Sequence, residues 1–286
     1  MIKSSNCTSL MKTFSGKTAV ITGAASGLGR SFAIHLANAG ANLALCDVNM
    51  DGLEETRGLI GENKLCVSLH RVDVSEQVQM EKFAVDVLAE HSTIDLLINN
   101  AGICYRPMRF EETTQAQFER MLAINFWGTF NGIRAFVPHL KTRPEAGILN
   151  VASLAGLVGL YGHSAYSISK SALKGMTEAL QAELSGTNVH VMIAYPGGVR
   201  TNLIRNAPNV PPEERGVSHD LFTKLSFLDA DRTTARILRA LRRGRYRSII
   251  GLDSKMILIV RKWIPQAYPA IAREFFRHAS FKPEDK

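Results

Sequence analysis

Closely spaced cysteines are absent from this chain of 286 residues. Its four cysteines, Cys7, Cys46, Cys66 and Cys104, are separated by 39, 20 and 38 residues, and no CxxC pair occurs. The paired spacing of zinc sites, redox motifs and disulfide frameworks is therefore missing. We expect no metal site, and a reduced, cytoplasmic setting fits best.

A long apolar run is also missing. The run Met256–Val260 has five residues and ends at Arg261, whereas a membrane span needs ~20. Residues 1–14 hold Lys3 and Lys12 but no continuous apolar stretch, so we expect no secretory signal. With 45% hydrophobic and 21% charged residues, the composition is that of a globular protein with a full core and excludes a disordered chain.

Acidic residues become scarce in the C-terminal fifth. Residues 232–286 carry 14 basic and 4 acidic side chains, against 20 and 22 over residues 1–231. The seven arginines of residues 232–247 raise nucleic-acid binding as one class of function. However, Ala235, Ile237, Leu238, Ala240 and Leu241 predict a buried helix face, which leaves the arginines on its wet face. No nucleic-acid motif accompanies them, so we expect no such partner.

Short apolar runs alternate with helical spacings along most of the chain. Strands are predicted at 18–22, 42–47, 65–72, 95–98, 148–151, 189–194 and 248–250, and helices at 27–39, 51–61, 75–91, 114–139, 164–184 and 232–243. Continuous apolar strands that alternate with helices are typical of a parallel sheet covered on both faces. We predict an α/β fold: one Rossmann-like, doubly wound domain with a mostly parallel seven-stranded sheet.

Two segments depart from this alternation. Residues 201–228 are rich in Asn, Pro and charge and are long for a connection, so we predict a lid within a catalytic domain at 16–251. Residues 1–15 form an N-terminal extension, and residues 252–286 a basic, amphipathic C-terminal one. Such a helix can lie in a membrane interface, which makes peripheral membrane contact possible. Packing across a subunit boundary or over the active site gives the same pattern.

A glycine-rich turn follows the first predicted strand. Residues 22–29 read TGAASGLG and open a predicted helix, and we assign cofactor contacts there to Gly23, Ser26, Gly27, Leu28 and Gly29. Glycines let the backbone turn sharply and approach a pyrophosphate, and the helix N-terminus offers N–H groups to its charge. The position between a strand and a helix supports a dinucleotide site.

Asp47 ends the second predicted strand, 18 residues after Gly29. A carboxylate there accepts hydrogen bonds from both ribose hydroxyls and repels a 2′-phosphate, which favours NAD over NADP. Arg30 favours NADP instead, because a basic residue near the loop could pair with that phosphate.

A third group combines Ser153 with Tyr166 and Lys170, which are four residues apart on a predicted helix and face the same way. A nearby ammonium favours the phenolate, so we expect the pKa of Tyr166 to be lowered from its reference of ~10. A phenol tuned in this way can exchange a proton with an alcohol or a carbonyl. Ser153 can hydrogen-bond the same substrate oxygen.

Together these segments resemble the short-chain dehydrogenase/reductase family, in its main subgroup of about 250 residues. The resemblance runs from about Gly16 to Gly251. It is carried, in order, by TGAASGLG at 22–29, Asp73-Val74, the NNAG segment at 99–102, Asn125, Ser153, YSISK at 166–170 and PGGVRT at 196–201.

The resemblance implies roles for the matching residues. Tyr166 would be the acid/base, Ser153 would position the substrate oxygen, and Lys170 would bind the nicotinamide ribose. Asn125 would help to hold a water that links Lys170 to solvent. The implied cofactor contacts further along the chain are Asp73, Val74, Asn99, Ala101, Gly102, Pro196, Gly197, Val199 and Thr201. The resemblance also implies a homodimer or homotetramer.

The substrate is expected to be lipophilic. The stretch between Ser153 and Tyr166 is mostly apolar, and the predicted lid adds the apolar residues Leu203, Ile204, Leu221, Phe222, Leu225, Phe227 and Leu228. A pocket of this kind suits a steroid-like, retinoid-like or aliphatic secondary alcohol or ketone. The alternatives are a small polar alcohol or an acyl thioester as substrate, or an NAD-binding protein without turnover.

Overall fold

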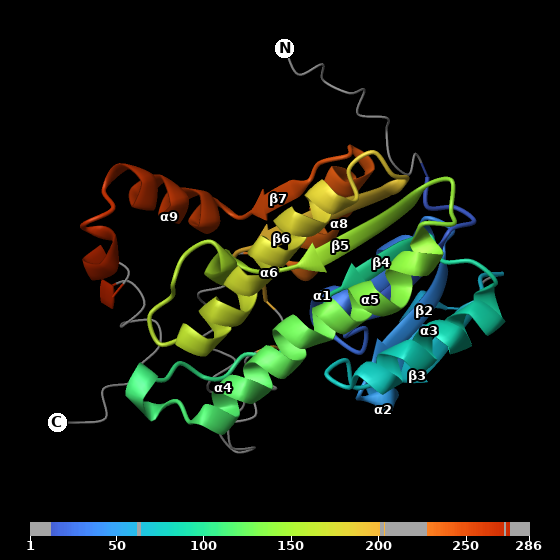
Figure 1. The fold of residues 1–286 in the computed structure, drawn as a ribbon, viewed down its shortest axis with the longest axis horizontal. Coiled ribbons are helices and arrows are strands. Elements are labelled where there is room, and N and C mark those ends of the chain that lie inside the picture. The colour runs from blue at the N-terminus through green and yellow to red at the C-terminus, as the bar shows by residue number, and fades with distance from the viewer. Residues whose placement is uncertain (1–12, 62–63, 201–202, 204–227, 272, 275–286) are drawn as a thin grey trace, which may run out of the picture.

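The computed structural model describes residues 13–61, 64–200, 203, 228–271 and 273–274. Seven strands form one sheet in the order β3-β2-β1-β4-β5-β6-β7, and every neighbouring pair is parallel (Figure 1). Their bounds are β1 Thr18–Thr22, β2 Asn42–Asp47, β3 Val67–Arg71, β4 Leu96–Asn99, β5 Ala146–Val151, β6 Val189–Pro196 and β7 Arg247–Ile250. The predicted fold class is confirmed, and the sheet is parallel throughout.

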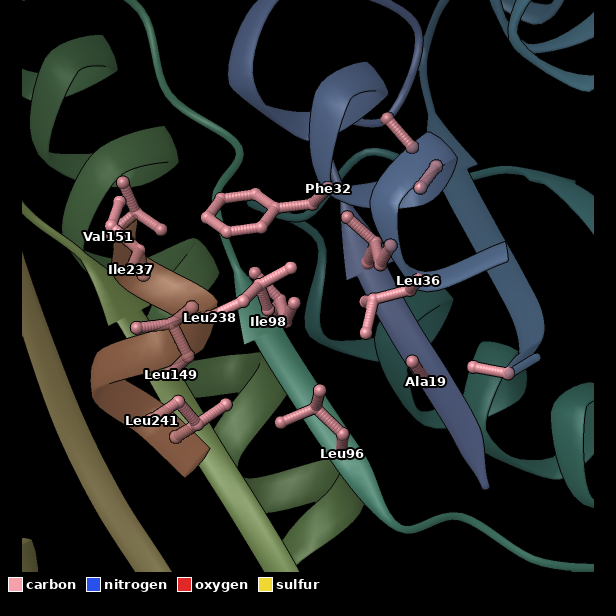
Figure 2. Close-up of a cluster of buried hydrophobic side chains, with 14 of the residues drawn as sticks. Ala19, Phe32, Leu36, Leu96, Ile98, Leu149, Val151, Ile237, Leu238 and Leu241 are labelled. Atoms are coloured by element: carbon pink, nitrogen blue, oxygen red, sulfur yellow. The ribbon is translucent and has the colours of Figure 1, made fainter. Parts of the chain in front are cut away.

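Helices cover both faces of this sheet. The α-helices of the described residues are α1 Gly27–Asn38, α2 Met50–Ile60, α3 Gln77–His91, α4 Gln115–Leu122, α5 Gly128–Leu140, α6 Ser164–Glu183, α8 Ala230–Arg242 and α9 Leu252–Trp263, of which α9 lies beyond the strand ends. Alternate strand residues face opposite layers: Ile21 packs with α1 and α8, while Val20 packs with α3 and α5. Figure 2 shows Phe32 and Leu36 of α1 meeting Ile237 and Leu238 of α8 over the central strands.

The predicted helix at 114–139 is divided in the structure. A π-helical turn, Ala123–Trp127, separates α4 from α5. π-Helical turns are rare and occur often at functional sites. This turn places Asn125 with its side chain fully buried between the segment that follows β4 and helix α6.

The predicted wet face of residues 232–243 is confirmed. Within α8, Ile237, Leu238, Ala240 and Leu241 are buried in the core, and the exposed positions include Arg232, Arg236, Arg239 and Arg242. The arginines therefore form the solvent-exposed face of a helix that packs on the core.

No described helix is long and apolar enough to cross a bilayer.

Candidate active site

The glycine turn after β1 brings backbone atoms into contacts that a side chain would block. Gly23 and Gly27 have φ values of +68° and +55°, in the region that favours glycine. A Cβ atom on Gly29 would lie 2.0 Å from the carbonyl oxygen of Gly23. The turn thus packs directly on the first turn of α1, while Leu28 packs against the core.

The start of α1 suits an anion. Ser26 is the N-cap residue, but its side chain makes no capping hydrogen bond, and the first turn holds no acidic residue. The helix N-terminus therefore presents backbone N–H groups and positive dipole charge. This geometry, with the close approach at Gly29, fits the pyrophosphate of a dinucleotide.

Asp47 lies beside this turn, at the end of β2. Its carboxylate accepts hydrogen bonds from the backbone N–H groups of Ala25 (3.1 Å) and Asn49 (3.0 Å), which fix its orientation. Arg30 points elsewhere. Its guanidinium donates to the Ala25 carbonyl, to Thr56 Oγ1 at 3.0 Å and to Glu55 at 2.8 Å. Arg30 therefore ties α1 to α2, and this role explains it without a 2′-phosphate.

The NNAG segment at the end of β4 is fastened to β1. Asn100 donates from its side chain to the carbonyl oxygens of Thr22 and Gly23, at 3.0 and 3.2 Å. The Thr22 hydroxyl accepts from the backbone N–H groups of Asn100 and Ala101, both at 3.0 Å. These two residues hold the glycine turn in register with the neighbouring strand. The sequence reasoning did not assign them roles, although both lie within the quoted motifs.

Asn99 is turned into the protein. It is 3% exposed, and its amide nitrogen donates to Asn150 Oδ1 on β5 at 2.9 Å. Asp73 accepts from the N–H and hydroxyl groups of Ser75, so its carboxylate stabilises the turn before α3. Val74 is buried, and a Cβ on Gly128 would lie 2.5 Å from it. All three have structural contacts, and their predicted contacts with the cofactor stay predictions.

Asn125 connects the NNAG segment to α6. Its Oδ1 accepts from the N–H of Ile103 at 2.8 Å, and its Nδ2 donates to the Ile103 carbonyl and to Ser169 Oγ, both at 3.0 Å. A Cβ atom on Gly102 would lie 3.0 Å from Asn125 Oδ1 and 3.3 Å from Lys170 Nζ. Because Gly102 has no side chain, the Asn125 amide and the Lys170 ammonium can both lie close to its backbone.

Tyr166 and Lys170 lie on one face of α6, as their spacing predicts. The lysine Nζ is 5.9 Å from the centroid of the Tyr166 ring and donates to the Val151 carbonyl at 3.1 Å. Both side chains are buried, at 9% and 4% exposure. Ser153, just after β5, caps the short helical turn Leu154–Gly156 by accepting from the Ala155 N–H at 3.2 Å.

The pKa of Tyr166 departs from the expectation. Burial raises it above 10.0, Cys104 raises it further, and a hydrogen bond with Ser153 lowers it in part. The expected lowering is therefore wrong for the chain by itself, because desolvation of the phenolate outweighs the lowering contribution, which comes from Ser153. Burial also lowers the pKa of Lys170, to about 8.

Apolar side chains surround the phenol. Tyr166 packs with Cys104, Tyr105, Met121, Ala155 and Ala165, and half-buried Ile103, Met108, Phe118, Leu160 and Leu203 add to this cluster. A hollow opens beside the ring, lined in part by Tyr105, Met108, Met121 and His163. Burial lowers the pKa of His163 and raises that of Cys104 to about 12, so both are neutral wall residues.

The PGGV segment continues β6. Pro196 ends the strand, Val199 is buried, and the N–H of Gly198 donates to the carboxylate of Asp253 at 3.0 Å. A Cβ on Gly197 would lie 2.3 Å from the same carboxylate. Asp253 was not predicted; its only sequence signal is an acid in the first turn after β7. Thr201 and nearly all of the predicted lid lie outside the described residues.

Comparisons with known proteins identify the family. The profile of the short chain dehydrogenase family matches residues 17–210. A putative oxidoreductase, SadH, from Mycobacterium tuberculosis is 35% identical over 90% of this chain and 94% of its own. The 3-ketodihydrosphingosine reductase of Bos taurus is 32% identical over 85% of this chain and 73% of its own.

Solved structures agree. A short-chain dehydrogenase/reductase from Burkholderia phymatum in complex with NAD superimposes with a TM-score of 0.76 and 26% identity, covering 96% of this chain and 98% of that one. The chain therefore belongs to the short-chain dehydrogenase/reductase family and has the fold of an oxidoreductase that uses a nicotinamide dinucleotide.

Proposed function

We propose that this chain is an NAD-preferring oxidoreductase that interconverts a lipophilic secondary alcohol and its ketone. The observation that carries the proposal is the buried Tyr166 phenol, which pairs with Ser153, packs in a cluster of apolar side chains and lines a hollow. Hydride transfer is the chemistry that the nicotinamide supplies when bound. The chain supplies proton transfer, orientation and exclusion of water.

For carbonyl reduction, Tyr166 acts as the general acid. Its raised pKa keeps the phenol protonated at neutral pH, so it can donate to the carbonyl oxygen that Ser153 also holds. Lys170, with its pKa near 8, is mostly protonated at pH 7 and stabilises the phenolate that remains. Asn125 lies beside Lys170 across Gly102, where a water could return the proton from solvent. Alcohol oxidation uses the same groups in reverse.

The cofactor preference rests on Asp47. Its carboxylate is fixed by Ala25 and Asn49 where the adenosine ribose would lie, and its negative charge repels a 2′-phosphate. The one nearby cation considered as a phosphate partner, Arg30, is engaged with Glu55 and Thr56. Gly23, Gly29 and the start of α1 would hold the pyrophosphate, and Val199 would meet the nicotinamide.

The substrate class rests on the wall of the hollow. Met108, Met121, Ala165 and Tyr105 give apolar contact, and Tyr166, which is hydrogen-bonded to Ser153, supplies the group that would meet the substrate oxygen. The polar side chains of the wall are Arg106, Thr113, His163 and Ser164. The resemblance to a 3-ketodihydrosphingosine reductase supports a long-chain ketone or alcohol ahead of a small polar alcohol or an acyl thioester.

We also propose a homodimer or homotetramer built through α5 and α6. Trp127, the last residue of the π-helical turn before α5, is 49% exposed, and Ile168 on α6 is 45% exposed. Large apolar side chains exposed there are expected where two copies pack.

The test follows nicotinamide absorbance with NAD and with NADP, using ketones and secondary alcohols that range from lipophilic to polar. We expect turnover on lipophilic members and a loss of roughly 10²-fold or more in Tyr166→Phe with unchanged dinucleotide affinity. Asp47→Ser should weaken use of NAD and improve use of NADP. Activity confined to polyols would refute the substrate class, and equal activity in Tyr166→Phe would refute the mechanism.

A further inference from the structure

Helix α9 carries its apolar side chains on the outside. Leu252, Met256, Ile259 and Trp263 recur at helical spacings of four, three and four residues, so they lie along one side of the helix. Their exposed fractions are 73%, 56%, 57% and 73%. We call these four residues the α9 stripe. A surface helix normally turns such a stripe inward, and α9 does the opposite.

Hydrogen bonds on the other side of α9 fix this orientation. Asp253 accepts from the N–H of Gly198, and Ser254, fully buried, donates to the carbonyl of Ile250. Arg261 donates to the carbonyl of Leu157, and beyond the helix Tyr268 donates to the carbonyl of Gly159 at 2.8 Å. These contacts point the stripe away from the domain.

The anchors also place the stripe near the site. Leu157 and Gly159 lie between Ser153 and Tyr166, and Gly198 lies in the segment after β6. Figure 1 shows α9 continuing from β7 and lying beyond the strand ends, beside the covered sheet rather than on its face. A surface that meets the stripe would therefore lie close to the segment between Ser153 and Tyr166.

The charges around the stripe are positive. Lys255 and Lys262 flank it on one side and are exposed, and the only acid of α9, Asp253, is engaged with Gly198. Lys262 also lies over the Trp263 ring, 5.5 Å from its centroid. A second copy of the helix is a poor partner, because antiparallel packing of two stripes would bring their lysines together. An anionic surface with an apolar interior complements both features.

We propose that the α9 stripe docks this protein on an anionic lipid bilayer, with Trp263 and Ile259 inserted at the headgroup boundary and Lys255 and Lys262 on the lipid charges. The proposal concerns a surface outside the active site and does not depend on which substrate the site takes. The membrane surface would be a binding partner in addition to the substrate and the cofactor.

The experiment uses full-length protein and vesicles of phosphatidylcholine with or without phosphatidylserine. We expect co-flotation with the anionic vesicles and, in a Trp127→Phe background that leaves Trp263 as the remaining tryptophan, a blue shift of its emission. Ile259→Glu should weaken vesicle binding by roughly tenfold or more, because it puts a charge into the inserted face. The matched control, Val85→Glu, changes a 65% exposed valine on α3 and should leave binding unchanged.

Charge is tested separately. Lys255→Glu and Lys262→Glu should each reduce binding roughly fivefold or more, whereas Lys141→Glu, at the end of α5, should have little effect. Thermal unfolding and turnover of Ile259→Glu equal to wild type would show that the fold and the site are intact. Equal vesicle binding by wild type and Ile259→Glu overturns the proposal. So does a shift of Ile259→Glu to a smaller oligomer in the absence of lipid, since the stripe would then be a contact between copies.

Discussion

The glycine turn and helix α9 both border the carboxyl edge of the sheet, but they are held in place differently. At Gly29 the contact is between backbone atoms, and even one methyl group would overlap the Gly23 carbonyl. At α9 a few polar contacts from Asp253, Arg261 and Tyr268 hold a helix whose apolar side faces solvent. Close packing fixes the first region, and single hydrogen bonds fix the second. Mutations should therefore have large effects in the first and graded effects in the second.

Gly29→Ala should give the largest effect. The new methyl group would lie 2.0 Å from the Gly23 carbonyl oxygen and 2.7 Å from the Asn100 side chain. We expect a loss of about 3 kcal/mol in the free energy of unfolding, since α1 and the turn must move apart. Urea unfolding measures it, and dinucleotide affinity should fall with it.

Gly58→Ala is the matched control. Gly58 is exposed in α2, and an added Cβ meets nothing within 4 Å, so alanine should stabilise the helix by about 0.5–1 kcal/mol. If Gly29→Ala stabilises the protein as Gly58→Ala does, helix propensity rather than the close approach governs Gly29.

Lys170→Met removes the buried charge at the centre of the site. We expect a loss of roughly 10²-fold or more in kcat, because the phenolate of Tyr166 loses its counter-charge. Stability should respond with a pH dependence. Burial lowers the pKa of Lys170 from 10.5 to about 8, so below about pH 8 the folded chain bears the full cost of a buried ammonium.

As the pH rises from about 8 towards 10.5, folded wild type releases a proton that the unfolded chain still holds, and wild type gains stability relative to the variant. Unfolding at several pH values in this window measures the difference between the two proteins. A difference that stays constant with pH would show that Lys170 has an ordinary pKa in the folded chain.

The sequence predicted the sheet and the position of the glycine turn because both depend on local patterns. The run Thr18–Thr22, the glycines after it and the spacing of Tyr166 and Lys170 are readable within a few residues. The direction of the Tyr166 pKa shift was wrong because it depends on burial by Cys104, Met121 and Ala155, which come from three separate segments.

Two further features of the structure were not predicted from the sequence, for the same reason. The π-helical turn at Asn125 interrupts a segment whose spacing predicts one helix, and within this turn Asn125 is hydrogen-bonded to Ile103 and Ser169 from other segments. Asp253 acts on Gly198, which is 55 residues away along the chain. A pattern read along the sequence does not reveal either partner.

Asp253→Ala should have a small effect on stability and a selective one on activity. It removes the carboxylate that accepts from Gly198 and fills the space between Gly197 and Gly251, at a cost of about 1 kcal/mol. Because Gly198 lies next to the segment assigned to the nicotinamide, we expect KM for the dinucleotide to rise while KM for the ketone changes little. Steady-state kinetics with each substrate varied in turn measures this split.

Asp51→Ala provides the control for Asp253. Asp51 occupies the same second position of its helix, α2, and is exposed, so its loss removes only a favourable interaction with the helix dipole, worth about 0.3–1 kcal/mol. A rise in dinucleotide KM in both variants would attribute the effect to net charge. A rise confined to Asp253→Ala would establish that the first turn of α9 positions the segment after β6, and that a helix held by single hydrogen bonds still acts on the closely packed edge.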